Sequence, residues 1–230
     1  MAQYELLVTD ITNFGDRRCV AGWDIERGKM IRPEPHPGGF WPAIKTGPRG
    51  VFELGRSVSF EARKPFPPTK LPHLTEDRVV VVGSIAKGPA VHNKNDITRT
   101  AAFDSLDALF ERNLVIDGQK AYVPVGAKCR SLGGLIVPST GLSVERYRNY
   151  EGKSRLRIGF RADGHYFAPN LTSTRAYEIS ASGELDKLNR TIAGSSEVLL
   201  RIGLARGFPA YPNRCYLQVN GLTVVPKEGA

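Results

Sequence analysis

Short apolar runs, broken at close intervals by glycine and proline, are the feature that most limits what this chain can fold into. The 230 residues include 24 glycines and 16 prolines, a high share for a helical protein. They separate stretches with strand character, such as Val-Ser-Phe-Glu-Ala at 58–62 and the valine run at 79–82. The pattern predicts a mainly β protein with a few helices, built as a barrel or a sandwich.

Runs with strand character recur in both halves of the chain. In the first half they cover residues 6–11, 20–25, 30–31, 58–62 and 78–85. In the second half they cover residues 132–137, 142–147, 156–160, 165–168, 197–205 and 215–225. Asp163-Gly164 joins two of these runs, and an Asp-Gly pair between strands is a strong hairpin signal.

Two segments have helical spacing instead. Residues 98–113 place five apolar side chains on one helical face, namely Ala102, Phe103, Leu106, Leu109 and Phe110. Residues 185–192 show the same spacing over a shorter length. We therefore expect a first β unit over residues 1–92, a helical connector over 93–120 and a second β unit over 121–230.

The chain carries an excess of positive charge. Lys and Arg number 32 against 23 Asp and Glu, which gives a formal net charge of +9 and an isoelectric point near 9.6. A folded protein this basic favours anionic partners, most often nucleic acid. The alternative is a generic basic protein whose charge serves solubility alone.

Cysteine usage and hydropathy indicate the compartment. Cys19, Cys129 and Cys215 are odd in number and far apart, so neither a disulfide framework nor a thiolate zinc site is expected. The N-terminus lacks the features of a signal peptide, and no apolar run reaches the length that spans a bilayer. We expect a cytoplasmic protein with reduced thiols, no metal, no cofactor and no membrane partner.

A basic hairpin is expected near the N-terminus. Arg17 and Arg18 precede one apolar run, and Arg32 follows the next. Gly28 lies between the two runs and can adopt the positive φ that a tight turn needs. Guanidinium groups suit phosphate oxygens, so the three arginines are candidate nucleic-acid contacts. Solvated turn charges without a ligand are the alternative.

Arginine alternates with apolar residues in the second half of the chain. Residues 155–161 run Arg-Leu-Arg-Ile-Gly-Phe-Arg, so period-two spacing places Arg155, Arg157 and Arg161 on one face of a strand. Any half-buried strand alternates in this way. The use of arginine at three positions on one face is what indicates anion binding.

Four further residues are candidate contacts to nucleic acid. Trp41 follows Phe40 in a loop rich in glycine and proline, where an aromatic ring can stack on a base or plug one end of a barrel. Arg201 and Arg206 flank another expected strand, and Tyr216 follows in a stretch where basic and aromatic residues mix.

One acid and histidine group offers a weak catalytic hypothesis. His73, Glu76 and Asp77 could act in acid–base chemistry or hold a metal, or they could form a local turn and ion-pair network. The sequence contains no phosphate loop, Rossmann fingerprint, nucleophile elbow, metalloprotease helix or EF-hand. These absences favour a binding protein over an enzyme.

Several stretches of sequence recur together in one known family. They read, in order, LLVTDITNFGDRRCVAGWDIERGKMIRPEP, KPFPPTKLPHLTEDRVVV, RLRIGFRADGHYFAPNLTS, EVLLRIGLARGFP and RCYLQVNGL. In this order they resemble the dual OB-containing domain family of prokaryotes, whose members open with a strand, a Gly-Arg-Cys-like hairpin and an Ile-Arg-Pro element. The chain departs from that pattern at Asp16-Arg17-Arg18-Cys19, where a leading glycine is common in the family.

The resemblance implies two small OB-like β-barrels joined by a helical connector, in a family associated with prokaryotic conflict and defence. It implies recognition of nucleic acid or a nucleotide, single-stranded or otherwise not B-form, by a sensor or adaptor with a protein partner in a defence system. It supplies no catalytic residues. Two alternatives stay open: an enzyme acting on such a ligand through His73, Glu76 and Asp77, and a module that docks an acidic protein.

Overall fold

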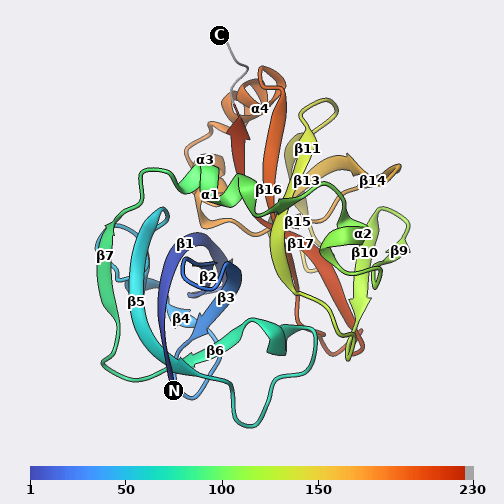
Figure 1. Ribbon diagram of the computed structural model, residues 1–230. Helices are drawn as coiled ribbons and strands as arrows, with labels where there is room; N and C mark the ends of the chain where they lie inside the picture. The colour runs from blue at the N-terminus through green and yellow to red at the C-terminus, as the bar shows by residue number, and fades with distance from the viewer. Residues whose placement is uncertain (226–230) are drawn as a thin grey trace. The chain divides into compact units, whose positions relative to one another are not determined.

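The computed structural model describes residues 1–225 and shows a mainly β protein, with 48% strand and 15% helix. The chain divides into two compact units, unit 1 from Met1 to Ala101 and unit 2 from Ala102 onwards. Each unit has a hydrophobic core of its own. Figure 1 shows the strands and helices of the chain. The expectation of a mainly β protein with a few helices is confirmed.

Unit 1 is a curled sheet that closes on itself. Its strands are β1 (Ala2–Phe14), β2 (Arg17–Asp24), β3 (Lys29–Glu34), β4 (Trp41–Pro42), β5 (Arg56–Arg63), β6 (Asp77–Val80) and β7 (Ala86–Ala90). It also contains the 3-10 turns η1 (Ala43–Lys45) and η2 (His73–Thr75) and the helix α1 (Lys94–Thr100). Strands β1, β2 and β3 are antiparallel neighbours, β3 pairs with β6 in parallel, and β5 pairs with both β6 and β1. These pairings form a closed ring of five strands.

The inside of this ring is filled by alternate residues of its strands, because successive side chains of a strand point to opposite faces. Its buried residues include Leu6, Val20, Ile31 and Phe60. The β2–β3 hairpin forms where the sequence predicts it, and Gly28 holds a φ of 61° in its turn. The hairpin that carries Arg17, Arg18 and Arg32 is therefore part of the barrel wall.

Unit 2 is a larger sheet covered by helices. Its strands are β8 (Ala102–Phe103), β9 (Val115–Asp117), β10 (Lys120–Pro124), β11 (Leu132–Pro138), β12 (Ser143–Arg148), β13 (Ser154–Ala162), β14 (His165–Phe167), β15 (Asn170–Leu171), β16 (Glu197–Leu204) and β17 (Arg214–Val225). Its helices are α2 (Leu106–Leu109), α3 (Thr174–Ala181) and α4 (Leu185–Ala193). The main sheet has the order β12-β13-β15-β17-β16-β11-β8.

The two units share much of their strand connectivity. In unit 1 the third strand is parallel to β6, and β5 pairs with both β6 and the first strand. In unit 2, β15 is parallel to β17, and β16 pairs with both β17 and β11. The likeness of the two units lies in this connectivity, since the sequences of the two halves show no convincing repeat.

The single helix expected over residues 98–113 is wrong. The segment instead forms α1, the short strand β8 and the one-turn helix α2. Ala102 and Phe103 pair with β11. These two residues therefore belong to the sheet, although their spacing in the sequence predicted a helix. The side chain of Ser105 then caps α2 by accepting the N–H of Ala108. No continuous helical connector spans residues 93–120. None of the helices within residues 1–225 combines the length and hydropathy needed to cross a bilayer.

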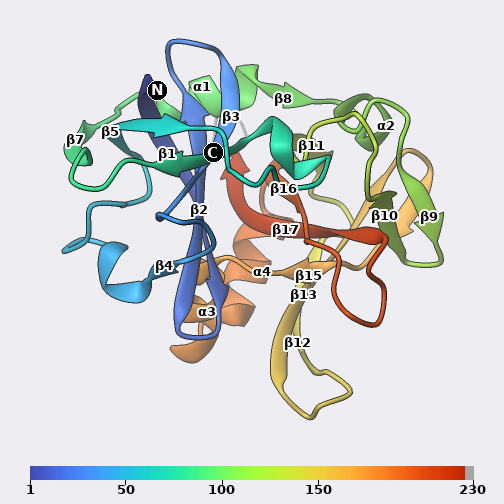
Figure 2. The ribbon, with the colours of Figure 1, turned by 90° about the horizontal axis from the view of Figure 1, so that it is seen from below.

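The β12–β13 hairpin extends from the body of unit 2 (Figure 2). Its base is held by Asn189 of α4. The side-chain amide of Asn189 accepts the N–H of Val144 at 2.9 Å and donates to the carbonyl of Val144 at 2.9 Å. A single side chain therefore occupies both backbone groups of this residue on the outer edge of β12.

Candidate nucleic-acid interface

One face of strand β13 carries the arginines that the sequence places together. Leu156, Ile158 and Phe160 are buried in the core of unit 2. Arg155 and Arg161 are exposed, and Arg157 is partly exposed, on the opposite face. The alternation predicted from the sequence is thus present in this strand, and it leaves three guanidinium groups outside the core.

Neighbouring strands add tyrosine and asparagine to this face. Tyr147 of β12 lies opposite Arg155, and Tyr166 of β14 lies opposite Arg161. Asn170 of β15 lies opposite Arg157. Side chains that are direct partners across a sheet share a face, so these residues form one surface. We call it the arginine–tyrosine face and define it by Tyr147, Arg155, Arg157, Arg161, Tyr166 and Asn170.

Tyr147 is held in place within this face. Its phenol donates a hydrogen bond to Oδ1 of Asn170 at 2.5 Å, which links β12 to β15. The guanidinium of Arg157 lies over the Tyr147 ring, 5.3 Å from the ring centroid. Burial raises the pKa of Tyr147 above its usual value. The ring is therefore fixed rather than free to rotate.

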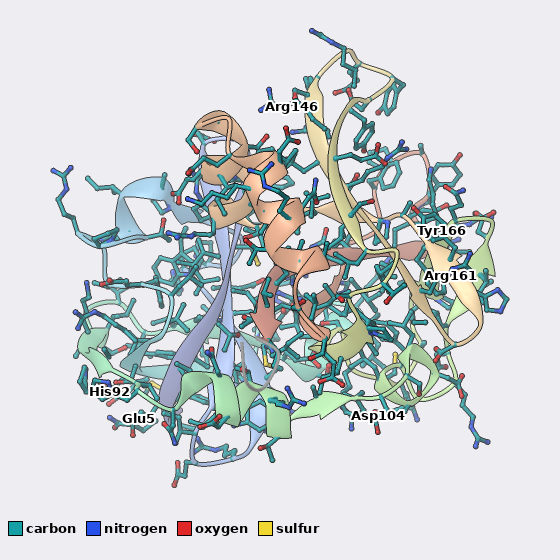
Figure 3. All side chains as sticks on the ribbon, turned by 90° about the horizontal axis from the view of Figure 1, so that it is seen from above. Glu5, His92, Asp104, Arg146, Arg161 and Tyr166 are labelled. Carbon is teal, nitrogen blue, oxygen red and sulfur yellow. The ribbon has the colours of Figure 1, made fainter. Side chains whose placement is uncertain are left out.

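Tyr166 lies across the same face beside Arg161, and Figure 3 shows the two residues together on the β13–β14 hairpin. The guanidinium of Arg161 is 5.9 Å from the centroid of the Tyr166 ring. A Cβ atom added to Gly159 would come within 2.2 Å of the Tyr166 hydroxyl. The absence of a side chain at Gly159 is what lets the Tyr166 ring lie down over the strand.

The three arginines differ in how they are held. Arg157 donates from Nε to Oε1 of Glu145 at 2.6 Å, with 40% of its side chain still exposed. The hydrogen bond to Glu145 raises the pKa of Arg157 above its usual value. Within residues 1–225, no hydrogen bond or ion pair engages the guanidinium of Arg155 or Arg161. Two of the three cations can therefore accept a phosphate without first losing a partner.

A second aromatic group lies on β10, β17 and the loop before β17. Tyr216 contacts Tyr122, Tyr211 and Phe208, with ring centroids 5.6, 5.8 and 6.3 Å away. Arg214 lies 4.6 Å from the Tyr122 centroid and also donates to the hydroxyl of Tyr216. The sequence prediction for Tyr216 thus falls in a real aromatic cluster. The cation of that cluster, Arg214, is partly exposed but already engaged by Asp117 and by the hydroxyl of Tyr216.

The tip of the β12–β13 hairpin presents one more aromatic ring. The side chain of Asn149 accepts the N–H groups of Glu151 and Lys153, which gives the turn a defined shape. Tyr150, held between these residues, is 92% exposed. Arg146, lower on the same hairpin, donates to the carbonyl and hydroxyl of Ser180 in α3 and so braces it (Figure 3).

In unit 1 the predicted arginines do not form one cluster. Arg17 is exposed at the end of the β1–β2 hairpin. Arg18 is turned onto its own turn, since its guanidinium donates to the carbonyls of Gly15 and Arg17. Arg32 is buried and donates to Asp77 at 2.6 Å, with side-chain exposures of 7% and 0%. The charge of Arg32 is therefore neutralised inside the fold. This placement does not support the prediction that Arg32 contacts a phosphate.

The surroundings of Arg32 keep it charged. Burial acts to lower its pKa and is the largest single influence, but Asp77, Cys19 and Glu76 together outweigh burial, and the net pKa is raised. Arg78, the next residue along β6, donates from Nε to the hydroxyl of Tyr4 at 3.0 Å and from its other nitrogens to backbone carbonyls. Two arginines of unit 1 thus belong to a buried polar network.

Trp41 and Arg201 are also buried, in contrast to the expectation that they contact a ligand. The Trp41 ring packs against Phe52 at 4.9 Å and its indole N–H donates to the carbonyl of Pro33 at 2.8 Å. The alternative reading of Trp41, as a plug at one end of the barrel, matches this placement. Arg206 is exposed in the loop after β16.

The acid and histidine group is enclosed rather than open. His73, Glu76 and Asp77 are all buried. Asp77 is paired with Arg32, and a carboxylate oxygen of Glu76 accepts the hydroxyl of Thr75. In the described part of the chain, no group of three or more His, Cys, Asp and Glu side chains is placed to hold a metal ion. The contact between Thr75 and Glu76 is local, as the turn alternative expects, but the ion pair of Asp77 is made with Arg32, 45 residues away.

The sequence prediction missed Tyr147, Tyr166 and Asn170. Tyr166 could have been predicted, because the Asp163-Gly164 turn fixes the register that puts Tyr166 opposite Arg161. Tyr147 depended on the register of a longer hairpin, and Asn170 on the antiparallel pairing of the two-residue strand β15 with β13.

Comparisons with known proteins add little. No family model matches the sequence, and neither does any curated protein. Among solved structures, a murine DNA binding protein bound with double-stranded DNA is similar with a TM-score of 0.36 and 8% identity, over 99% of this chain and 100% of that one. A likeness at this level carries no argument about ligand or fold.

Proposed function

We propose that the protein is a non-enzymatic nucleic-acid recognition module that binds single strands on the arginine–tyrosine face of unit 2. The observation that carries the proposal is the pairing, on one exposed surface, of free guanidinium groups with fixed tyrosine rings. Non-specific binding of single strands combines these two elements: cations along the backbone and aromatic rings on which bases stack.

Single strands suit this face better than a duplex does. Tyr147 and Tyr166 can stack only on bases whose faces are open, and a duplex hides those faces. The free cations of Arg155 and Arg161 lie directly across from these two rings, so a backbone running along β13 meets both kinds of group. Stacking does not depend on base identity, and we expect weak sequence preference.

The shared connectivity supports assigning both units to OB-like barrels. An OB fold is a five-stranded Greek-key barrel that commonly binds oligonucleotides. The five-strand ring of unit 1 fits this description, and unit 2 has the corresponding parallel pairing and a helical segment before β16. Membership of the dual OB-containing family, and with it a role as sensor or adaptor in prokaryotic defence, is part of the proposal and rests on the motif order alone.

The test is a salt titration of single-strand binding. Labelled mixed-sequence DNA and RNA strands are titrated with the full chain and with a triple variant, Arg155→Gln, Arg157→Gln and Arg161→Gln. Every phosphate that the variant no longer neutralises should reduce the log–log salt slope by about 0.7, so the triple variant should lose about 2 units of slope. Affinity for strands should fall at low salt, while far-UV circular dichroism stays unchanged.

A charge-matched control separates a site from net charge. Arg49→Gln, Arg63→Gln and Lys64→Gln remove three exposed cations from unit 1 and change the net charge by the same amount. Binding by this control variant should show most of the salt dependence of the unsubstituted protein, measured as the log–log slope. An equal loss in both triple variants would contradict a site on unit 2. Binding of an acidic protein, with no measurable affinity for any strand, would favour the docking alternative.

A further inference from the structure

The exposed phenyl ring of Phe14 stacks on the half-buried ring of Phe40 at the end of the β1–β2 hairpin in unit 1. The rings of Phe14 and Phe40 are parallel within 11°, with centroids 4.2 Å apart. Phe14 is 60% exposed, so the stack covers one face of its ring and leaves much of the rest in water. A single exposed apolar side chain needs no explanation. A parallel pair outside the core does, because stacking places a flat aromatic surface towards the solvent.

The Phe40 ring of the stack is held in place by Trp41, the buried residue that follows it in the chain. Strand β4 pairs with the start of β2, which sets Trp41 opposite Arg18. Trp41 is fixed in the core by its ring contact and its indole hydrogen bond. Because Phe40 precedes Trp41 directly, the anchored tryptophan limits where the Phe40 ring can go. The platform is thus built into the barrel rather than carried on a free loop.

A free cation lies beside the platform. Arg17 is the direct cross-strand partner of Phe14, so the two side chains share a face of the hairpin. In the part of the chain that the structure describes, no hydrogen bond or ion pair engages the Arg17 guanidinium. Arg18, by contrast, directs its guanidinium onto the turn. One exposed carboxylate, Asp16, is adjacent in sequence and opposes a highly charged ligand.

The two glycines next to the rings face open space. A Cβ atom added to Gly15, which follows Phe14, would meet no other atom within 4 Å. The same holds for Gly39, which precedes Phe40. A planar ligand can therefore approach the Phe14 ring without displacing the two neighbouring glycines.

We infer that Phe14 and Arg17 form a second site, independent of the arginine–tyrosine face, that takes one unpaired purine base and its phosphate. The base extends the phenyl stack by lying on the open face of Phe14, where a purine offers a larger ring surface than a pyrimidine. The phosphate lies against Arg17, whose planar fork suits phosphate oxygens. The ligand is either a free nucleotide or the unpaired end of a strand, since both present this chemistry.

The test uses 2-aminopurine, whose fluorescence is quenched on stacking. The full chain carrying Arg155→Gln, Arg157→Gln and Arg161→Gln, which removes the cations proposed for unit 2, is titrated with 2-aminopurine nucleoside monophosphate. It is also titrated with a short strand carrying 2-aminopurine at one end or in the middle. Quenching of the monophosphate assigns a free nucleotide, and quenching only at the strand end assigns a terminal base.

Phe14→Leu and Arg17→Gln then locate the site. Phe14→Leu keeps an apolar side chain but loses the ring, and should weaken binding at least about five-fold, the lower end of what one stacked base contributes. Arg17→Gln should weaken binding and flatten its salt dependence without abolishing quenching. Asp16→Asn should strengthen binding. The inference would be overturned if no titration showed quenching. It would also be overturned if Phe14→Leu gave the same titration curve as the protein that keeps Phe14. Because the unit 2 arginines are already replaced, neither result bears on the proposed function.

Discussion

Arginine is used in opposite ways in the two units. In unit 1, the residue opposite Arg32 across the β3–β6 pair is Asp77, and both side chains are enclosed. In unit 2, the residue opposite Arg155 across the β12–β13 pair is Tyr147, and the guanidinium stays in water. Each arginine lies on a strand beside apolar residues. A buried carboxylate partner holds Arg32 inside the fold, whereas the aromatic partner of Arg155 leaves its guanidinium in water. The carboxylate opposite Arg157, that of Glu145, is itself exposed and leaves Arg157 partly exposed as well.

The contrast between the two units also separates arginines that stabilise the fold from arginines that can bind a ligand. A buried ion pair is costly to break, since the remaining charge loses its counterion in a medium of low polarity. An exposed cation contributes little to folding and stays available to a ligand. We therefore expect substitutions in the Arg32 network to act on unfolding, and substitutions on the arginine–tyrosine face to act on affinity.

The largest effect is expected from Arg32→Met. The substitution keeps much of the side-chain length but leaves the carboxylate of Asp77 buried and unpaired by Arg32, which should lower the free energy of unfolding by about 3–5 kcal/mol. Both tryptophans of the chain, Trp23 and Trp41, lie in unit 1. Their fluorescence in a urea titration therefore reports on unit 1.

The control for this variant is Arg17→Met, which removes an exposed arginine from the same barrel wall. It should change the free energy of unfolding by about 0.5 kcal/mol or less. An Arg32→Met protein as stable as the control would mean that Arg32 is not part of a stabilising network, and the contrast between the units would fail.

Tyr4→Phe should have the next largest effect. The phenol of Tyr4 accepts the Nε–H of Arg78, and its loss leaves a buried charged donor without that acceptor. A cost of about 1–3 kcal/mol is typical of such a group. The tryptophan-detected urea midpoint should fall, and strand binding by unit 2 should be unchanged. A stability equal to that of the natural protein would show that Arg78 finds another acceptor.

Glu145→Gln should raise affinity for single strands by up to about five-fold, the upper end of what an exposed ion pair contributes. The carboxylate of Glu145 holds Arg157 in the free protein and repels phosphate. The amide releases the guanidinium and removes the repulsion. Fluorescence anisotropy at low salt measures the change, with Glu151→Gln on the hairpin tip as the matched loss of one charge. Weaker binding would show that Glu145 positions Arg157 for the strand.

The smallest effect is expected on the stability of Arg155→Gln. Its guanidinium has no hydrogen bond or ion pair within residues 1–225, so the free energy of unfolding should change by no more than about 0.5 kcal/mol. Circular dichroism in urea measures it. A larger loss would mean that this arginine, like Arg32, serves the fold.

Periodicity predicted more of the fold than of the site. The alternation at 155–161 and the Asp163-Gly164 turn predict the β13–β14 hairpin, because each depends on neighbours in sequence. The prediction for Arg32 fails because its partner is 45 residues away, on a strand joined to it in parallel. The helix over 98–113 was wrong for the same kind of reason, since a remote strand, β11, pairs with Ala102 and Phe103.

The amide of Asn189 has a consequence for how copies of the chain meet. An exposed strand edge offers N–H and C=O groups to any passing strand, and such edges nucleate aggregation. At Val144 both groups are already taken by one side chain, so a foreign strand cannot begin pairing there. Only an amide carries a donor and an acceptor side by side as a peptide group does. At Val144, Asn189 thus takes the place that a neighbouring strand would otherwise occupy.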